Sequence, residues 1–81
     1  MVSKNLIEKA NRFGFNVYEP TEDVIRFSTY GEVPCELKRT NGQRWVGFVY
    51  PNHAYLPVKK FEGTKNRALN RCFIELTKEI N

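Results

Sequence analysis

Several residue types and patterns that would assign a function are scarce in this chain. Two cysteines and one histidine among 81 residues are too few for a secreted disulfide scaffold or a zinc-ligand set. No glycine-rich phosphate loop occurs, and no apolar run approaches the roughly 20 residues of a membrane span. The apolar residues Leu6 and Ile7 near the start stand among charged ones, which is unlike a signal peptide. We therefore expect a cytoplasmic protein with reduced thiols, no metal, no cofactor and no membrane partner.

Side chains that could carry catalysis are also few. His53 is the single histidine, and the sequence places no nucleophile beside it. A bystander in a loop is the simpler interpretation, and a metal-independent ribonuclease is the alternative. The acids of residues 19–23 stand beside proline and threonine, which is typical of a solvated turn. Cys35 and Cys72 fall on expected core faces, where free cysteine acts as a small hydrophobic residue. The sequence therefore predicts no enzyme.

Positive charge is abundant, and it is unevenly placed along the chain. Thirteen Lys and Arg residues against nine Asp and Glu residues give a net charge of +4. Residues 38–71 hold eight basic residues against one acid, or +7, whereas residues 1–37 carry −2 and the last ten carry −1. Gathered like charges repel unless an anionic partner relieves them, and a nucleic acid backbone is the commonest such partner. A solvated basic face that keeps a small protein soluble is the alternative.

Length and composition indicate one folded domain over residues 1–81. A hydrophobic content of 41% and an aromatic content of 14% suffice for a small packed core. A domain of this size buries only roughly 60–65% of its unfolded surface. Its stability is therefore slim, and a monomer or a homodimer is expected.

Apolar periodicity predicts a helix at each end of the chain with strands between them. Residues 3–13 have helical spacing, with Ser3 as N-cap and Gly14 as C-cap, and Thr64 caps a longer helix over 64–80. Strand-like runs cover residues 15–18, 24–29, both sides of Asn41-Gly42, and 55–60. This order predicts an α+β, two-layer domain, with an antiparallel sheet of three to four strands and both helices on one face.

The Asn41-Gly42 dipeptide is the clearest turn signal. It predicts a two-residue type I′ hairpin, which fixes the strand register. In that register the core face receives Cys35, Leu37, Val46 and Phe48. Lys38 and Trp45 then lie on the outer face, and Arg39 directly opposes Arg44. An exposed Trp45 beside cations has the composition of a base-stacking platform, whereas a cation–π contact or cover from a second layer is the alternative.

The closing helix supplies the second group of candidate residues. Four cations are expected to crowd its start: Lys59, Lys60, Lys65 and Arg67. Free backbone N–H groups and the positive end of the helix dipole make this a phosphate site, unless the long side chains only reach into water. Arg71 extends the basic strip along the solvent face, next to Ile74. The predicted nucleic-acid-binding residues are therefore Lys38, Arg39, Arg44, Trp45, Lys59, Lys60, Lys65, Arg67 and Arg71.

The order helix, strands, helix, with basic residues leading into the last helix, resembles the double-stranded RNA-binding domain. The segment Gly63-Thr64-Lys65-Asn66-Arg67-Ala68-Leu69-Asn70 is similar to that family's basic, alanine-containing helix start. The resemblance implies that Lys65 and Arg67 contact phosphates across a groove. The family's alanine-rich helix is replaced here by Arg71-Cys72-Phe73, and its first loop is not recognisable around residues 21–23. The small size and basic half also resemble accessory proteins of bacteriophages, several of which bind RNA or block a host defence.

These observations predict a small basic protein that binds nucleic acid, preferentially RNA, without enzymatic activity. The alternative is a phage-type inhibitor or adaptor whose basic face blocks an acidic host protein, such as an RNA-handling toxin or defence enzyme. Its interface anchors would then be Trp45, Tyr50, Tyr55 and Ile74.

Overall fold

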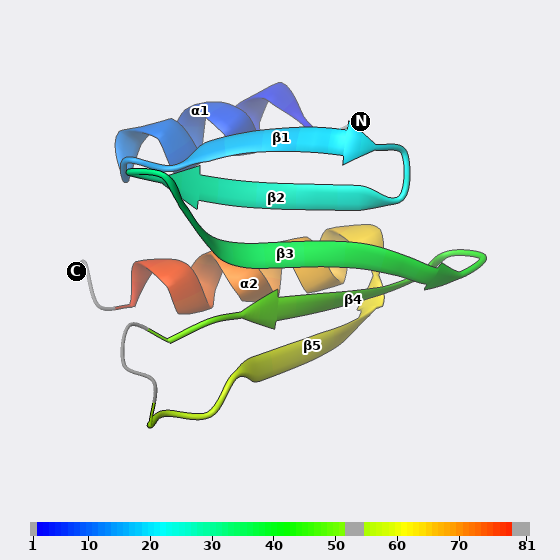
Figure 1. Cartoon of the computed structure of the whole chain (residues 1–81). Coiled ribbons are helices and arrows are strands. Elements are labelled where there is room, and N and C mark those ends of the chain that lie inside the picture. The colour runs from blue at the N-terminus through cyan, green and yellow to red at the C-terminus, as the bar shows by residue number, and fades with distance from the viewer. Residues whose placement is uncertain (1, 52–54, 79–81) are drawn as a thin grey trace.

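The structure, a computed structural model that describes residues 2–51 and 55–78, is a five-stranded sheet with two helices (Figure 1). In chain order the elements are α1 (Lys4–Arg12), β1 (Asn16–Thr21), β2 (Val24–Thr29), β3 (Glu32–Asn41), β4 (Arg44–Val49), β5 (Lys59–Thr64) and α2 (Lys65–Thr77). All strand pairs are antiparallel, and the strands lie in sequence order. The predicted α+β class is confirmed, and the sheet has one strand more than the upper expectation.

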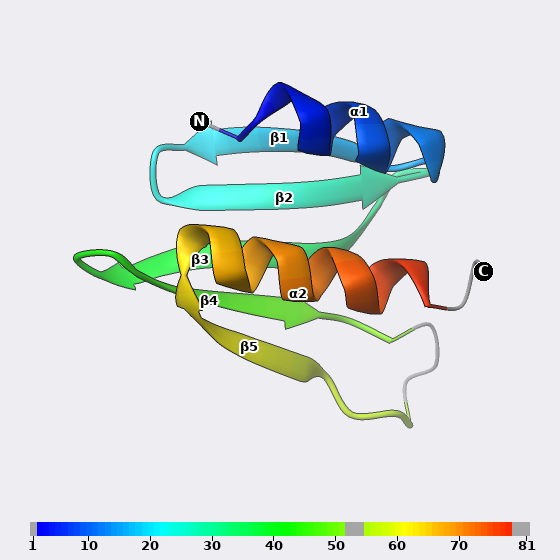
Figure 2. The same ribbon diagram turned by 180° about the vertical axis from the view of Figure 1, so that it is seen from behind.

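Both helices cover the same face of the sheet, as predicted, and run side by side in the same direction (Figures 1 and 2). The helix α1 contacts β1, and α2 contacts β3, β4 and β5. We call α1 and α2 the helical layer and the uncovered side the open sheet face. Neither helix in the described part of the chain is long and apolar enough to cross a membrane.

Side-chain caps fix where both helices begin. The Ser3 hydroxyl accepts a hydrogen bond from the Leu6 N–H at 3.3 Å, and the Thr64 hydroxyl accepts one from the Arg67 N–H at 3.4 Å. Each cap satisfies an N–H group that has no partner within its helix. Both predicted N-caps are therefore confirmed, whereas the C-cap of α1 is Phe13, and Gly14 follows it with a positive φ of 88°.

The core lies between the sheet and the helical layer. Its largest fully buried side chains are Phe27, Ile25, Leu37, Cys35 and Cys72. Phe73 of α2 joins the layers, because its ring centroid lies 5.7 Å from that of Phe13 and 6.4 Å from that of Phe27. The two cysteines are free and buried, as predicted. A hydrogen bond between their thiols, together with burial, raises the pKa of Cys35 far above its ordinary value, so this thiol stays protonated.

The β3–β4 hairpin differs from its prediction by one residue in register. Asn41 pairs with Arg44 around a Gly42-Gln43 turn, and the pairing shifts between Arg39 and Asn41. As a result, Leu37 faces Gly47 instead of Val46. The type I′ prediction is wrong because it needs a positive φ at Asn41 and Gly42, and only Gly42 has one, at 54°.

This slip exchanges the two faces of β4. Trp45, Gly47 and Val49 point toward the helices, and Val46 and Phe48 point to the open sheet face. Two consecutive positive φ values occur instead at Tyr30 and Gly31, in the turn between β2 and β3.

Candidate nucleic-acid interface

Acids of the same strand or of neighbouring segments pair with the cations of the sheet. The ion pairs are Arg26–Glu36, Lys38–Glu36, Arg39–Asp23, Arg44–Glu62, Lys60–Glu62 and Lys59–Glu75. They include five of the eight predicted phosphate-binding cations. Each exposed pair contributes only about 0–1 kcal/mol to stability, but it cancels much of the local positive potential. The sheet is therefore a weaker polyanion surface than the sequence predicts.

Glu36 and Glu75 are two of the carboxylates that hold two cations each. The hydrogen bond from Arg26, and then that from Lys38, lowers the pKa of Glu36 against the opposing effect of burial. Hydrogen bonds from Lys59 and then Lys78 lower the pKa of Glu75 in the same way. Both carboxylates therefore stay ionised and paired at neutral pH.

The predicted crowding of cations at the start of α2 is wrong. Residues 59–64 form the strand β5, so Lys59 lies at the opposite end of that strand from Lys65. A strand extends by about 3.3 Å per residue, which separates the two by about 20 Å. Lys60 points to the open sheet face beside Phe48, whereas Arg67 and Arg71 lie exposed on α2.

The prediction that Trp45 is an exposed stacking platform is also wrong. Its side chain is 5% exposed and packs in the core beneath the start of α2, because the register slip turned it toward the helices. The Lys65 Nζ atom lies 5.4 Å from the centre of its ring. The cation–π alternative therefore describes Trp45, although the contact comes from α2 and not from the facing strand.

Six cations of the helical layer have no ion pair with any residue that the structure describes. They are Lys4, Lys9, Arg12, Lys65, Arg67 and Arg71. We call them the helical cations. Lys9 lies at the junction of the helices, with its Nζ atom 5.6 Å from the centre of the Phe73 ring. Only three of the six were predicted site residues.

The net charge of the chain separates by layer. Residues 16–64, which form the sheet and its connections, contain six cations and six acids. Residues 2–15 and 65–78 contain seven cations but only Glu8 and Glu75, or +5. The signal for the missed cations, Lys4, Lys9 and Arg12, was three cations against one acid within α1. It was hidden because the amino-terminal half has a negative net charge.

A groove separates the starts of the two helices. It has a volume of about 300 Å³ and is lined by Val2, Ser3, Leu6, Lys65, Asn66, Leu69 and Asn70. Neither helix has an acid in its first turn. Hydroxyl, amide and ammonium groups along the groove are donors that suit phosphate oxygens. The groove therefore adds hydrogen-bond donors to the positive helical layer.

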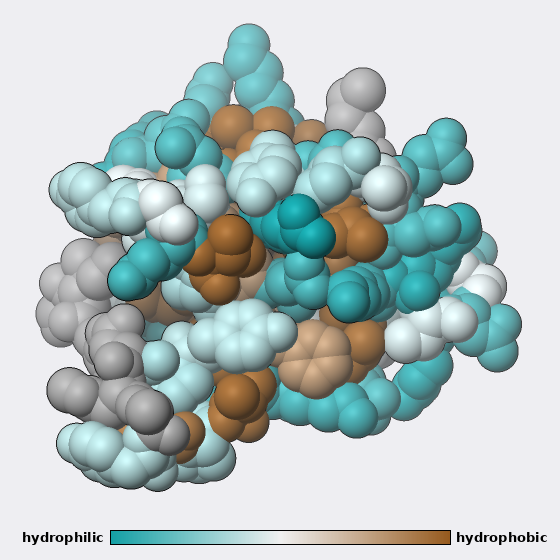
Figure 3. All heavy atoms as spheres, in the orientation of Figure 1, coloured by the Kyte–Doolittle hydropathy of each residue, from teal (hydrophilic) through white to brown (hydrophobic). Residues whose placement is uncertain are grey.

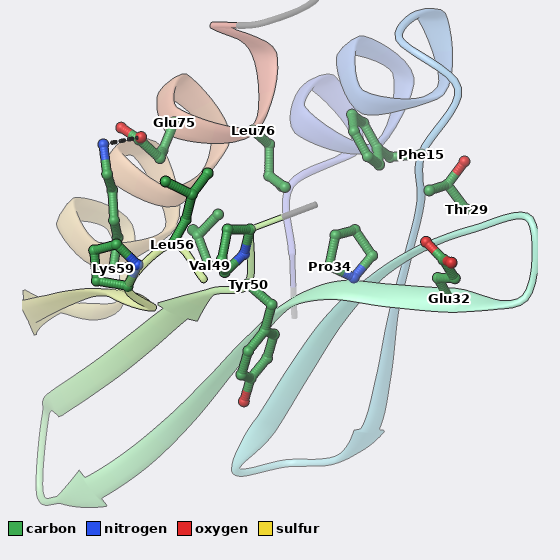
Figure 4. A pocket seen from close by; sticks show the side chains of 12 residues that line it. Phe15, Thr29, Glu32, Pro34, Val49, Tyr50, Leu56, Lys59, Glu75 and Leu76 are labelled. Carbon is green, nitrogen blue, oxygen red and sulfur yellow. Dashed lines mark ion pairs between the residues drawn. The ribbon is translucent and has the colours of Figure 1, made fainter. Parts of the chain in front are cut away.

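A second hollow, which we call the Leu56 pocket, lies at the other end of the sheet (Figure 4). It has a volume of about 340 Å³, and its apolar wall includes Phe15, Pro34, Val49, Leu56 and Leu76. The Lys59–Glu75 ion pair lies at one side. Of the predicted protein-docking anchors, Tyr50, Tyr55 and Ile74 are exposed and Trp45 is not.

Within residues 2–51 and 55–78, no three His, Cys, Asp or Glu side chains gather as metal ligands. His53 lies outside the described residues. The resemblance to the double-stranded RNA-binding domain stays a prediction. Scans against protein-family models, curated proteins and solved structures found no match to this chain.

Proposed function

We propose that this chain is a small nucleic-acid-binding protein that prefers RNA and catalyses no reaction, and that the helical layer is its binding surface. The observation that carries the proposal is the separation of charge by layer. The helical layer holds the positive excess, and its six helical cations lack carboxylate partners among the described residues. The proposal moves the interface away from the hairpin and onto both helices.

Phosphate is the ligand that this charge pattern fits best. The two helices lie side by side, and α2 spans about 20 Å at 1.5 Å per residue. Arg67 and Arg71 are one helical turn apart on its solvent side. Such a surface contacts several backbone phosphates at once, and the release of their counterions favours binding. The preference for RNA is supported by the resemblance of residues 63–70 to the start of the closing helix in the double-stranded RNA-binding domain.

The test compares two double variants that each remove two positive charges. Arg67→Gln with Arg71→Gln alters the helical layer. Lys38→Gln with Lys60→Gln is the matched control, because it leaves Glu36 paired with Arg26 and Glu62 paired with Arg44. Fluorescence anisotropy with a labelled 20-base-pair RNA duplex measures Kd at low salt, and the DNA duplex of the same sequence measures the preference.

We expect the helical double variant to bind duplex RNA at least about tenfold more weakly, because each lost phosphate contact removes a counterion-release contribution. The control should stay within about twofold of the wild type. Equal losses in both variants, or no loss in either, would contradict the proposed surface. Circular dichroism confirms that both variants are folded.

The Leu56 pocket favours a second candidate function, which is docking to a protein. Its neighbourhood contains several exposed apolar side chains, namely Val33, Tyr50, Tyr55, Leu56 and Val58. Monomeric proteins rarely expose apolar groups together without a partner. This function predicts a stoichiometric complex with one protein that survives nuclease treatment. Leu56→Asp should dissociate that complex, and Arg67→Gln with Arg71→Gln should not.

A further inference from the structure

The open sheet face carries aromatic side chains that the helical layer does not use. Neighbouring strands place Tyr18, Arg26, Glu36, Phe48 and Lys60 in one row across the whole sheet, which we call the Phe48 row. Tyr18 is 41% exposed, and Phe48 is half-buried although no helix covers it. Apolar and aromatic side chains lie between hydrophilic ones along the middle of this face (Figure 3).

A third aromatic residue continues the pattern along β4. Tyr50 is 42% exposed and follows Phe48 by two residues, a spacing of about 7 Å along an extended chain. Its N–H donates to the Pro34 carbonyl oxygen at 2.8 Å, so strand-like pairing continues past the end of β4. Figure 4 shows its ring on the side of the strand away from Val49 and Leu76. Phe48 and Tyr50 therefore place two aromatic rings on the same side of the extended chain, two residues apart.

Cations surround these rings and are held in place. Glu36 binds both Arg26 and Lys38, and Glu62 binds both Arg44 and Lys60. Four cations against two acids leave two excess positive charges on this face. The side chains of Lys38, Arg44 and Lys60 are 55–60% exposed, so their outer atoms are accessible to a ligand. Beneath them Val46 is 6% exposed and forms a closed floor.

From this arrangement we infer that the open sheet face is a second nucleic-acid surface, which takes unpaired bases of a single-stranded RNA. Bases stack on the rings of Tyr18, Phe48 and Tyr50, and the neighbouring Lys and Arg side chains contact the phosphates between them. Stacking requires bases that are splayed out of a helix, so a duplex does not fit this face. The inference rests on the proposed function, because its ligand is again nucleic acid.

Charge complementarity selects this occupant over a second copy of the chain. A face-to-face dimer would bring two surfaces with the same positive excess together, which is unfavourable. A polyanion whose bases are flat and apolar matches both the rings and the cations. A protein that stacks bases on its open sheet face and binds phosphates on its helical layer contacts two nucleic-acid segments at once.

The test replaces rings by an aliphatic side chain. Tyr18→Leu with Phe48→Leu keeps apolar volume but removes the stacking surface, and Tyr55→Leu is the matched control in the β4–β5 connection. The probe is a fluorescein-labelled 12-nucleotide polyuridine strand, measured beside the 20-base-pair RNA duplex. We expect the double variant to bind the single strand at least about tenfold more weakly, since each stacked base contributes at least about fivefold. Its duplex affinity and both affinities of Tyr55→Leu should stay within about twofold.

Each contrary outcome has a distinct meaning. Unchanged single-strand binding by the Tyr18, Phe48 double variant overturns this inference and leaves the proposed helical surface standing. Unchanged duplex binding by Arg67→Gln with Arg71→Gln sinks the proposed function instead. A dimer of the wild type that Phe48→Leu dissociates assigns the face to a second copy and also overturns the inference.

A direct readout covers the case in which the double variant does not fold. Wild-type protein is irradiated with the same strand carrying 4-thiouridine, and the crosslinked residues are identified by mass spectrometry. Crosslinks at Tyr18, Phe48 or Tyr50 are the expected result. Crosslinks confined to residues of α1 and α2 would overturn the inference.

Discussion

Gly47 is the residue that lets α2 approach the middle of the sheet. A Cβ atom there would lie 2.4 Å from the Cys72 Sγ atom and 3.2 Å from the Leu37 Cγ atom. Both neighbours are fully buried, so neither can turn aside into solvent. The close contact positions the helix that carries Lys65, Arg67 and Arg71.

We predict that Gly47→Ala destabilises the protein by about 1–3 kcal/mol, the usual cost of overpacking a core. For a domain of this size, that lowers Tm by roughly 4–24 °C. Urea denaturation measures the change. The double variant Gly47→Ala with Cys72→Ala should be more stable than the sum of the two single effects by at least about 0.5 kcal/mol, because the clashing sulfur is gone. Strict additivity would show that this contact does not limit the packing.

Glu36 predicts a pH dependence of stability. Its pKa is lowered in the folded protein by Arg26 first and Lys38 second, so the unfolded chain binds its proton more tightly. The stabilising contribution is therefore complete above the unfolded pKa of about 4.3 and is lost as pH falls through the folded value. Glu36→Gln should unfold at lower urea concentration than the wild type at pH 7, and this difference should shrink steadily below about pH 4.3. Chemical unfolding at several pH values measures it.

The control for this prediction is Glu32→Gln. Glu32 is exposed and has no ion pair with a described residue. This variant should follow the wild type across the whole pH range. A Glu36→Gln difference that is the same at pH 3 and pH 7 would contradict the ionic explanation.

At the scale of elements, the charges at the start of α2 do not favour the stability of the helix. Lys65 and Arg67 occupy its first turn, where positive charge opposes the helix dipole, and no acid is present there. Thr64 is the N-cap, so Arg67 stands at the position where a capping box has Glu.

We predict that Arg67→Glu stabilises the protein by about 0.5–1 kcal/mol, because it completes a capping box and matches the dipole. The same change should weaken duplex RNA binding by about tenfold or more, because it places an acid among the helical cations. Thermal unfolding and anisotropy measure the two effects. Arg71→Glu is the control, since it faces Glu75 one turn later and should weaken binding without adding stability. Lower stability of Arg67→Glu would contradict the capping argument.

The elements differ in how well local sequence determines them. Both helices and their N-caps were predictable, because the capping hydroxyls of Ser3 and Thr64 each accept a hydrogen bond from an N–H group only three residues later in the chain. The β3–β4 register was not, because a bulge at Thr40 moved the turn by one residue, and the Thr40 hydroxyl bonds the Arg44 carbonyl oxygen at 3.2 Å. One residue of slip was enough to bury Trp45 and expose Phe48.

At the scale of the whole molecule, charge counted along the chain differs from charge arranged in space. The basic stretch 38–71 meets acids from outside it, because Glu36 lies two residues before Lys38 in β3 and folding brings Asp23 of the β1–β2 turn to Arg39. The amino-terminal part is acidic on average, yet its helix adds Lys4, Lys9 and Arg12 to the face of α2. Arg67 and Arg71 lie together on the solvent side of α2, whereas Lys65 lies over the Trp45 ring at the start of the helix. Which of the other predicted cations are paired could be decided only from the contacts of the folded chain.

The six helical cations predict how strongly salt weakens duplex RNA binding. If each neutralises one phosphate, log K should fall with log salt at a slope of about −5. Arg12→Gln and Arg71→Gln should each make the slope less negative by about one, because each removes one counterion-releasing contact. Lys60→Gln should leave the slope unchanged, since Lys60 is paired with Glu62 on the open sheet face. A slope near zero would show that binding does not depend on phosphate contacts. The same shift for Lys60→Gln as for Arg12→Gln would show that the binding charge is not confined to the helical layer.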